Sequence, residues 1–441
     1  MGRRRLPPSI VAVALLLATA APPAAAQDWR AAGVVAFDAA WLTVNDTFYD
    51  PEFGGLDWAA VRTELRPQVE AAASADDQRA IIRGMLSRLG TSHFALLGSS
   101  SAPDDLRGPA GVPFDVRVVG DAVLVTRLHD EAADIAPAAI QPGDRIVRID
   151  DTDVATLIAA IGDEDPRHRQ LAWRRVAREL SGAEGEPLRL LVQAPEIESE
   201  PREVRMSRTV GPGEIVTVGN LPPLRAHLEA EERQTPAGRR AGVIRFNVWM
   251  AAVAEPFASA VDRFREHAGL VIDLRGNPGG LADMIRGVAG HVLTEPAVLG
   301  RMRMRGLDLE FRANPRRSTT DGRTVTPYAG PVALLVDALT ASASECFAGA
   351  LQGLGRVTVF GTRTSGQALP ASTQQLANGD VLLYVVGDFV TSTGQRLEGV
   401  GVVPDVEVPL EADALAEGRD ALHAALAWID DQSMPGVPET H

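Results

Sequence analysis

Residues 269–280 read GLVIDLRGNPGG, a nearly all-apolar run that ends in a glycine-rich turn. Such a run, without polar alternation, is typical of a parallel strand that is buried on both faces. A helix-like segment follows at 281–293, and a second apolar run, PVALLVDA, occupies 331–338. This alternation of strand and helix predicts an α/β core with a largely parallel sheet over residues 210–430.

The second apolar run leads into a turn of small residues with two hydroxyl groups. Residues 339–349 read LTASASECFAG, with Ser342 and Ser344 just before an apolar stretch. This turn and GNPGG both follow strands, where α/β proteins place their sites. On local pattern alone, a serine here is more often a helix N-cap than a nucleophile. GNPGG is equally compatible with a loop that approaches a ligand and with a tight turn.

A nucleophilic serine needs a group that accepts its proton. The chain contains no lysine, so all 43 basic residues are arginines, which stay charged near neutral pH. Of the eight histidines, His93 differs from the others because it lies in a turn, in LGTSHF at 89–94. A lone histidine in a turn is more often structural than catalytic, so the residues alone leave both interpretations open.

The first 26 residues have the pattern of a secretory signal peptide. Three arginines precede a short apolar core, and Ala24–Ala26 forms a cleavage pattern. We expect a bacterial protein exported to the periplasm, with a disordered Ala/Pro tail as the alternative. No later run is long enough to span a bilayer. The formal net charge of −15 argues against nucleic acid as a partner, and no metal-ligand spacing occurs.

The periodicity changes along the chain and divides it into segments. Residues 27–105 have helical spacing and carry the Ser-His motif. Residues 106–209 alternate like hairpins and predict a small β-rich domain. The α/β core at 210–430 follows, and residues 431–441 are expected to be a flexible tail.

Together, LGTSHF, DLRGNPGG and TASASE resemble the motifs of the C-terminal processing peptidase and tricorn family of serine peptidases. SASE resembles the nucleophile motif, which makes Ser342 the nucleophile. DLRGNPGG resembles the loop that helps to build the oxyanion hole. The segment from GVPF to GDRIVRIDDTDV resembles the PDZ domain of the family. The resemblance implies a multidomain α/β protein with a ClpP/crotonase-like core, an N-terminal helical segment and an inserted PDZ-like β-rich domain.

The resemblance also indicates a branch of the family. Peptidases of the Ser-Lys type carry lysine about 25 residues after the nucleophile, and this chain has Gln367 there. The tricorn-like branch uses a histidine after a serine, which Ser92 and His93 match. It also uses a glutamate before a G-V-x-P-D stretch, which Glu398 matches in LEGVGVVPD. A Ser-Lys dyad is therefore excluded.

The resemblance implies a role for each of these residues. Ser342 attacks the peptide carbonyl, His93 takes the proton, and Ser92 orients the imidazole. Glu398 acts through Ser92 or a nearby hydroxyl and holds the group in register. The oxyanion would be bound by the amide of Ala343 and by one amide of Gly279 or Gly280. The carboxylate of a bound peptide end would meet the PDZ-like loop at Gly111, Val112 and Phe114.

The sequence thus predicts an exported serine peptidase that acts on polypeptides and needs no cofactor or metal. Its oligomeric state is left open. Two other functions also remain open at this stage. One is a catalytically inactive ligand- or peptide-binding protein on the same scaffold, as in interphotoreceptor retinoid-binding protein. The other is an acyl-transferring or ester-hydrolysing enzyme with a related core.

Overall fold

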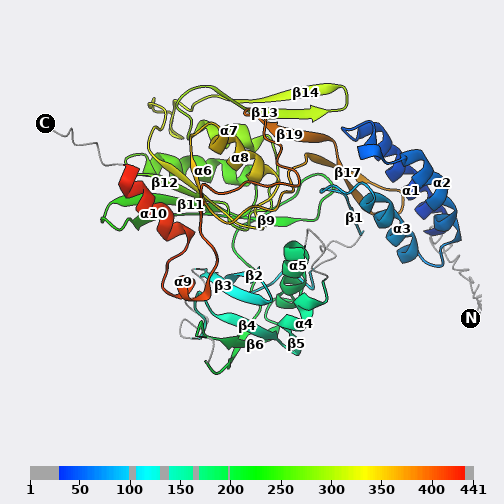
Figure 1. The fold of residues 1–441 in the computed structure, drawn as a ribbon, viewed down its shortest axis with the longest axis horizontal. Coiled ribbons are helices and arrows are strands. Elements are labelled where there is room, and N and C mark those ends of the chain that lie inside the picture. The colour runs from blue at the N-terminus through cyan, green and yellow to red at the C-terminus, as the bar shows by residue number, and fades with distance from the viewer. Residues whose placement is uncertain (1–28, 99–105, 130–138, 162–167, 197–198, 433–441) are drawn as a thin grey trace, which may run out of the picture.

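In the computed structural model, the described residues are 29–98, 106–129, 139–161, 168–196 and 199–432. They form a mixed α/β protein, which confirms the predicted class (Figure 1). The predicted signal peptide and residues 433–441 of the predicted tail lie outside these ranges. Among the helices within them, none has both the length and the apolar character that a membrane span requires.

The core sheet contains six strands in the order β10-β11-β12-β15-β16-β20. Their bounds are β10 (Leu228–Gln234), β11 (Arg240–Phe246), β12 (Leu270–Asp273), β15 (Val332–Val336), β16 (Thr358–Gly361) and β20 (Val406–Glu407). β10 is antiparallel to β11, and the other neighbouring pairs are parallel. β12 and β15 are the two apolar runs, and every residue in them is buried. They lack polar alternation because neither face meets solvent.

Helices cover both faces of this sheet. One face carries α6 (Ala251–Phe264), α7 (Met284–Gly290) and α8 (Ala343–Gly353), and the other carries α10 (Ala421–Gln432). Side chains of successive strand residues point to opposite faces of the sheet and so pack against different helices. Ile272 packs in the same cluster as Phe347 of α8, whereas its neighbour Val271 packs with Ile429 of α10.

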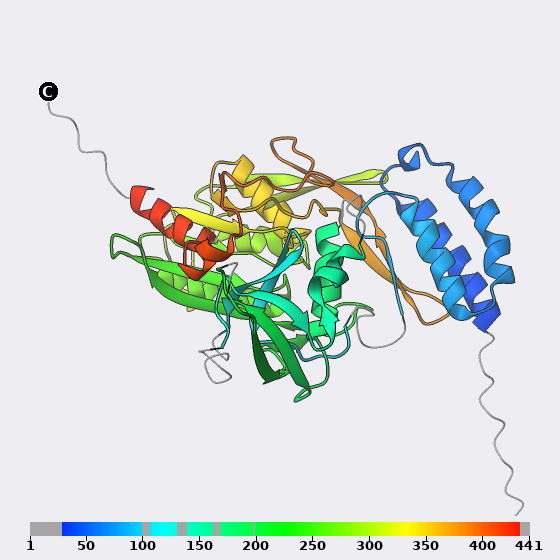
Figure 2. The same cartoon turned by 60° about the horizontal axis from the view of Figure 1, so that its bottom comes forward.

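The N-terminal helices lie at one end of the molecule, far from α10 (Figures 1 and 2). They are α1 (Trp29–Thr47), α2 (Trp58–Ala71) and α3 (Ala75–Ser87), with a short 3-10 turn at Phe53–Gly55. The strand after them, β1 (Ala95–Leu97), pairs antiparallel with β18 (Val381–Val385), which pairs with β17 (Ala371–Gln375). The helices share one hydrophobic cluster with Leu376 and Leu382 of this sheet region. Strand pairing and apolar burial therefore fix the three N-terminal helices and β1 onto the last third of the chain.

The segment between the N-terminal helices and the core forms an antiparallel sheet with its own hydrophobic cluster. Its strands are β2 (Phe114–Val119), β3 (Ala122–Leu128), β4 (Arg145–Ile149), β5 (Thr152–Asp153), β6 (Pro187–Gln193) and β7 (Arg202–Ser207). Two helices, α4 (Val154–Ala159) and α5 (His168–Leu180), complete it. We call residues 106–209 the inserted unit. β2 lies at one edge of its sheet, in the order β2-β3-β4-β6-β7.

Smaller elements complete the described chain. β13 (Ala297–Met304) pairs with β14 (Leu307–Ala313) and β19 (Gly387–Thr391) in a three-stranded sheet. β8 (Glu214–Val216) pairs with β9 (Leu224–Ala226), and the short helix α9 (Ala412–Ala416) precedes α10.

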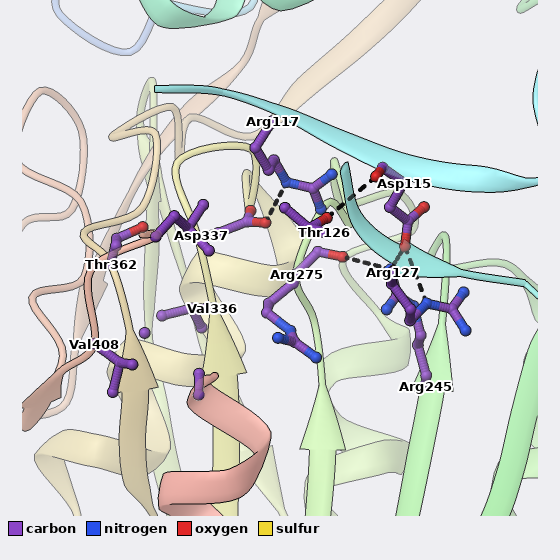
Figure 3. A pocket seen from close by; sticks show the side chains of 13 residues that line it. Asp115, Arg117, Thr126, Arg127, Arg245, Arg275, Val336, Asp337, Thr362 and Val408 are labelled. Carbon is purple, nitrogen blue, oxygen red and sulfur yellow. Dashed lines mark hydrogen bonds and ion pairs between the residues drawn. The ribbon is translucent and has the colours of Figure 1, made fainter. Parts of the chain in front are cut away.

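Ion pairs join the inserted unit to the carboxyl ends of the core strands, around a small pocket (Figure 3). Arg117 of β2 donates from Nε to Asp337 Oδ2 at 2.6 Å, and both side chains are less than a tenth exposed. Asp115 of the same strand accepts from Arg245 of β11 at 2.6 Å. Burial raises the pKa of Asp115, but Arg245 and the other nearby donors bring it well below the ordinary value. The carboxylate is therefore held ionised at this interface.

Removing Arg117 should destabilise the protein, because Asp337 would remain buried without its cation. We expect Arg117→Met to lower the free energy of unfolding by about 3 kcal/mol. Urea unfolding, followed by tryptophan fluorescence, measures the change. Arg205→Met is the control, because Arg205 forms an exposed ion pair with Glu203 and should change stability by less than about 1 kcal/mol. Equal effects of the two variants would contradict the interpretation.

Candidate active site

Ser342 lies in the turn between β15 and α8, in a conformation that is unusual for serine. Its φ and ψ are 56° and −119°. A non-glycine residue with positive φ costs of order 1–3 kcal/mol and persists only where its surroundings hold it. The Ser342 amide donates to Gln367 O at 2.8 Å and to Glu345 Oε2 at 3.2 Å. Such strain is typical of a serine that a strand-to-helix turn presents as a nucleophile.

Glu345 is the buried anchor of this turn. Its side chain is fully enclosed, and it accepts from Thr364 Oγ1 at 2.5 Å, Gly366 N at 2.8 Å and Gln367 N at 2.9 Å. Burial raises the pKa of Glu345 above its ordinary value, although these hydrogen bonds act in the opposite direction. The carboxylate thereby fixes segment 364–367 against the nucleophile turn.

Ser92, His93 and Glu398 form one hydrogen-bonded group, although 306 positions separate Ser92 from Glu398. The Ser92 amide donates to Glu398 Oε1 at 2.8 Å, and its hydroxyl donates to Oε2 at 2.9 Å. The same hydroxyl lies 2.7 Å from His93 Nδ1. A hydroxyl has one proton, and here it goes to Glu398. His93 must then donate from Nδ1, which leaves Nε2 as the free base.

One dipeptide connects this group to the nucleophile turn. Gln367 O accepts from the Ser342 amide, and the next amide, that of Ala368, donates to Glu398 Oε2 at 2.9 Å. The Ser342 amide and the Glu398 carboxylate are therefore held by adjacent residues, Gln367 and Ala368. Among the described residues, no hydrogen bond joins Ser342 to His93. Such bonds are often long without substrate and tighten when it binds.

The environment of His93 keeps its imidazole neutral. The residue is half-buried and has a positive φ of 60°. Burial lowers the pKa of His93 to about 4, because a cationic ring would lose its hydration. A neutral ring is the form that can accept the proton of a serine.

The glycine-rich turn lies directly against the nucleophile. A Cβ added to Gly279 would come within 2.6 Å of Ser342 Cβ and 2.9 Å of Ala343 N, so only glycine fits there. The Gly279 amide donates to Asn277 Oδ1 at 3.0 Å. In the described part of the chain, the amides of Gly280 and Ala343 have no hydrogen-bond partner. Of the two predicted glycines, Gly280 is thus the one with a free donor.

Other residues of this region, which the sequence analysis did not single out, hold the turns in place. Asn277 is fully buried and donates from Nδ2 to Phe246 O at 2.8 Å. Trp249 donates from Nε1 to Ser344 Oγ at 2.8 Å, which makes Ser344 structural. Asn277 belongs to the motif DLRGNPGG, and that signal could have identified it. Trp249 has no comparable local signal.

The Gln367 side chain meets the inserted unit. Its amide donates from Nε2 to Gln170 Oε1, and Gln170 lies in the first turn of α5. Gln367, at the position where Ser-Lys peptidases carry lysine, therefore links the α/β core to the inserted unit.

The predicted carboxylate loop of the inserted unit departs from expectation at Gly111. The Gly111 amide donates to Thr209 O at 2.9 Å, so it has no proton left for a ligand. Because Thr209 lies 98 positions further along the chain, no local sequence pattern predicts this pairing. Val112 and Phe114 have no such backbone partner within the described residues. Three or more His, Cys, Asp or Glu side chains do not gather as a metal site anywhere in those residues.

Comparison with known proteins finds related peptidases. Residues 240–408 match the model of peptidase family S41, and residues 30–87 match the tricorn protease C1 domain. The carboxyl-terminal-processing protease of Synechocystis sp. is 26% identical over 386 residues, which cover 84% of this chain and 80% of the relative. The chloroplastic C-terminal processing peptidase of Tetradesmus obliquus is 27% identical over 385 residues, which cover 84% and 76%.

Two solved structures share the fold. The photosystem II D1 C-terminal processing protease aligns with a TM-score of 0.53 at 22% identity, covering 88% of this chain and 99% of that one. Mature CPAF aligns with a TM-score of 0.62 at 13% identity, covering 92% and 99%. Over residues 240–408 the chain is similar to peptidase family S41, and the relatives named above are carboxyl-terminal-processing peptidases. It is a serine-type peptidase, as the motifs predict, and a non-catalytic role is not favoured.

If His93 is the base, activity should persist to low pH, because burial keeps its ring neutral. With a pKa of about 4, the ring becomes protonated and inactive only as the pH falls through that value. We expect the acid limb of kcat/KM near pH 4, with a tenfold loss per unit below it. Hydrolysis of a fluorogenic peptide library measures the profile, and circular dichroism at each pH checks the fold. An acid limb between pH 6 and 7 would show that His93 is solvated.

Proposed function

We propose that Ser342 hydrolyses peptide bonds of polypeptides, with His93 as its base. Ser342 Oγ attacks the carbonyl, and His93 Nε2 takes the hydroxyl proton and gives it to the leaving amine. Water then cleaves the acyl-enzyme with the same base. The observation that carries the proposal is the dipeptide Gln367–Ala368, which ties the Ser342 turn to Glu398 and, through Ser92, to His93.

The remaining groups support this reaction electrostatically. Ser92 transmits the orientation set by Glu398 and fixes the His93 tautomer. The amides of Ala343 and Gly280 bind the oxyanion, and Ala343 begins α8, whose N-terminal end favours negative charge. Loss of one such donor typically costs roughly two to three orders of magnitude in rate.

We also propose a type for two of the domains and a cellular location for the protein. The inserted unit acts as a PDZ-like domain that presents extended segments of the substrate, and the core is of the ClpP/crotonase type. The arginine-containing leader directs the chain to the periplasm of a bacterium, where Gln27 becomes the new N-terminus. N-terminal sequencing of the protein from a periplasmic extract tests the export.

Fluorophosphonate labelling tests the nucleophile and the base. The wild-type protein should be modified at Ser342, located by mass spectrometry. Ser342→Ala and His93→Ala should abolish the label, because the first removes the nucleophile and the second its base. His423→Ala, at an exposed histidine, should label normally. A wild-type protein that is folded and takes no label would instead support a ligand-binding function on this scaffold.

Ser92→Ala should lower kcat by roughly 10²–10⁴-fold, the usual contribution of a correctly placed general base. KM should change little, because Ser92 orients the imidazole and does not bind substrate. Ser92→Thr keeps the hydroxyl and should restore most of the rate. Steady-state kinetics on a fluorogenic peptide measures both variants. Equal losses in the two variants would mean that the position matters for packing and not for its hydroxyl.

A further inference from the structure

The strand β14 forms one edge of the three-stranded sheet β14-β13-β19 and lies on the outside of the molecule (Figure 1). Of its seven residues, only Phe311 and Ala313 are buried. Leu307 is 53% exposed and Leu309 is 42% exposed. In the described part of the chain, no second strand pairs with β14 on its outer side. This edge therefore presents apolar side chains and unpaired backbone groups to solvent together.

The free backbone groups of β14 belong to alternate residues. Leu299 O accepts from Ser392 N at 3.1 Å, so the odd-numbered residues of β13 bond to β19 and its neighbour. The even-numbered residues of β13 therefore bond to β14, where Met302 lies opposite Leu309. Hydrogen-bonded and non-bonded pairs alternate along an antiparallel ladder. The N–H and C=O groups that point to the outer edge are thus those of Asp308, Glu310 and Arg312.

Most of the features that protect an edge strand from pairing are missing from β14. Such edges are usually blocked by lysine, by proline, by a bulge or by a covering segment. The chain contains no lysine, and Pro315 comes after the end of β14. The irregularity of this hairpin lies between Val298 and Gly300 of β13, so it interrupts the partner strand. Charged side chains also protect edges, but those of β14 include both signs.

These charges select one symmetric arrangement of two copies. Arg312 Nη2 donates to Glu310 Oε1 at 2.9 Å, so both side chains lie on one face. A two-fold axis perpendicular to the sheet places one residue opposite its own copy. With Leu309 or Glu310 at the axis, acidic side chains lie opposite each other, which is destabilising. With Phe311 at the axis, Glu310 lies opposite Arg312 of the second copy, and this attractive pair occurs twice.

We propose that β14 pairs antiparallel with β14 of a second copy of this chain, with Phe311 at the two-fold axis. The two three-stranded sheets then form one continuous sheet, and Leu309 packs beside Ala313 of the second copy. In Figure 1, β14 lies on the far side of the core from the inserted unit, so the pairing leaves that unit free. The proposal concerns assembly and goes beyond the proposed function, because it does not depend on which residue is the nucleophile.

Sedimentation velocity over a range of concentrations tests the pairing. The protein carries Ser342→Ala, which prevents self-digestion, and should change from monomer to dimer as its concentration rises. Glu310→Arg should raise the dissociation constant of the dimer by about tenfold or more, because it creates two like-charged pairs across the axis. Arg312→Glu should have the same effect. The double exchange, Glu310→Arg with Arg312→Glu, restores both attractive pairs and should restore the dimer.

Asp283→Arg is the control for the change in net charge. Its side chain is 83% exposed on a different element, so this variant should dimerise as the parent protein does. Circular dichroism checks that each variant is folded. A monomer at every concentration would overturn the proposal. A dimer that Glu310→Arg leaves intact, or that the double exchange fails to restore, would overturn it as well.

Hydrogen–deuterium exchange locates the interface independently of these variants. Exchange in residues 307–313 should slow as the concentration rises, because the outward N–H groups become paired, and α10 should stay unchanged. Dimerisation without protection of 307–313 would place the interface elsewhere and reject the pairing of β14. Since all of these measurements use the Ser342→Ala protein, their outcome is separate from that of the labelling experiment on the wild type.

Discussion

The buried carboxylate of Glu345 is the interaction on which the catalytic centre depends. It accepts hydrogen bonds from the nucleophile turn and from segment 364–367. A buried carboxyl group without hydrogen-bond partners would be costly, so the partners of Glu345 hold the two segments together. The positive φ of Ser342 is sustained by this arrangement. The segment that Glu345 holds then carries the Ala368 amide to Glu398.

The number of protons that Ser92 can donate determines the tautomer of His93. Glu398 accepts both protons that Ser92 can donate, from its amide and its hydroxyl. The hydroxyl oxygen can then only accept from His93, and burial keeps that ring neutral. His93 is therefore protonated on Nδ1, because the Ser92 hydroxyl donates its proton to Glu398. The imidazole carries no charge in this arrangement. In the proposed mechanism, a serine between the carboxylate and the base has the orienting role that a directly bonded aspartate has in other triads.

Local sequence patterns predict the buried strands of the core and the turns that follow them. Buried strands β12 and β15 appear as unalternating apolar runs, and the turns after them hold Ser342, Gly279 and Gly280. The Ser92–His93 pair and Glu398 were assigned through a family resemblance, and the structure brings them into contact. Other features depend on partners far away in the chain. The Gly111–Thr209 pairing, the Gln170–Gln367 contact and the Arg117–Asp337 ion pair join positions that no local pattern relates.

The placement of the base has a consequence for partly folded chains. His93 comes just before β1, which joins the rest of the protein by pairing with β18, almost 300 positions later. If His93 is the base of Ser342, the site is complete only after that pairing has formed, however complete the core sheet is. A nascent or partly unfolded chain would then lack the proposed base. Chain topology would thereby couple formation of the proposed site to completion of the fold.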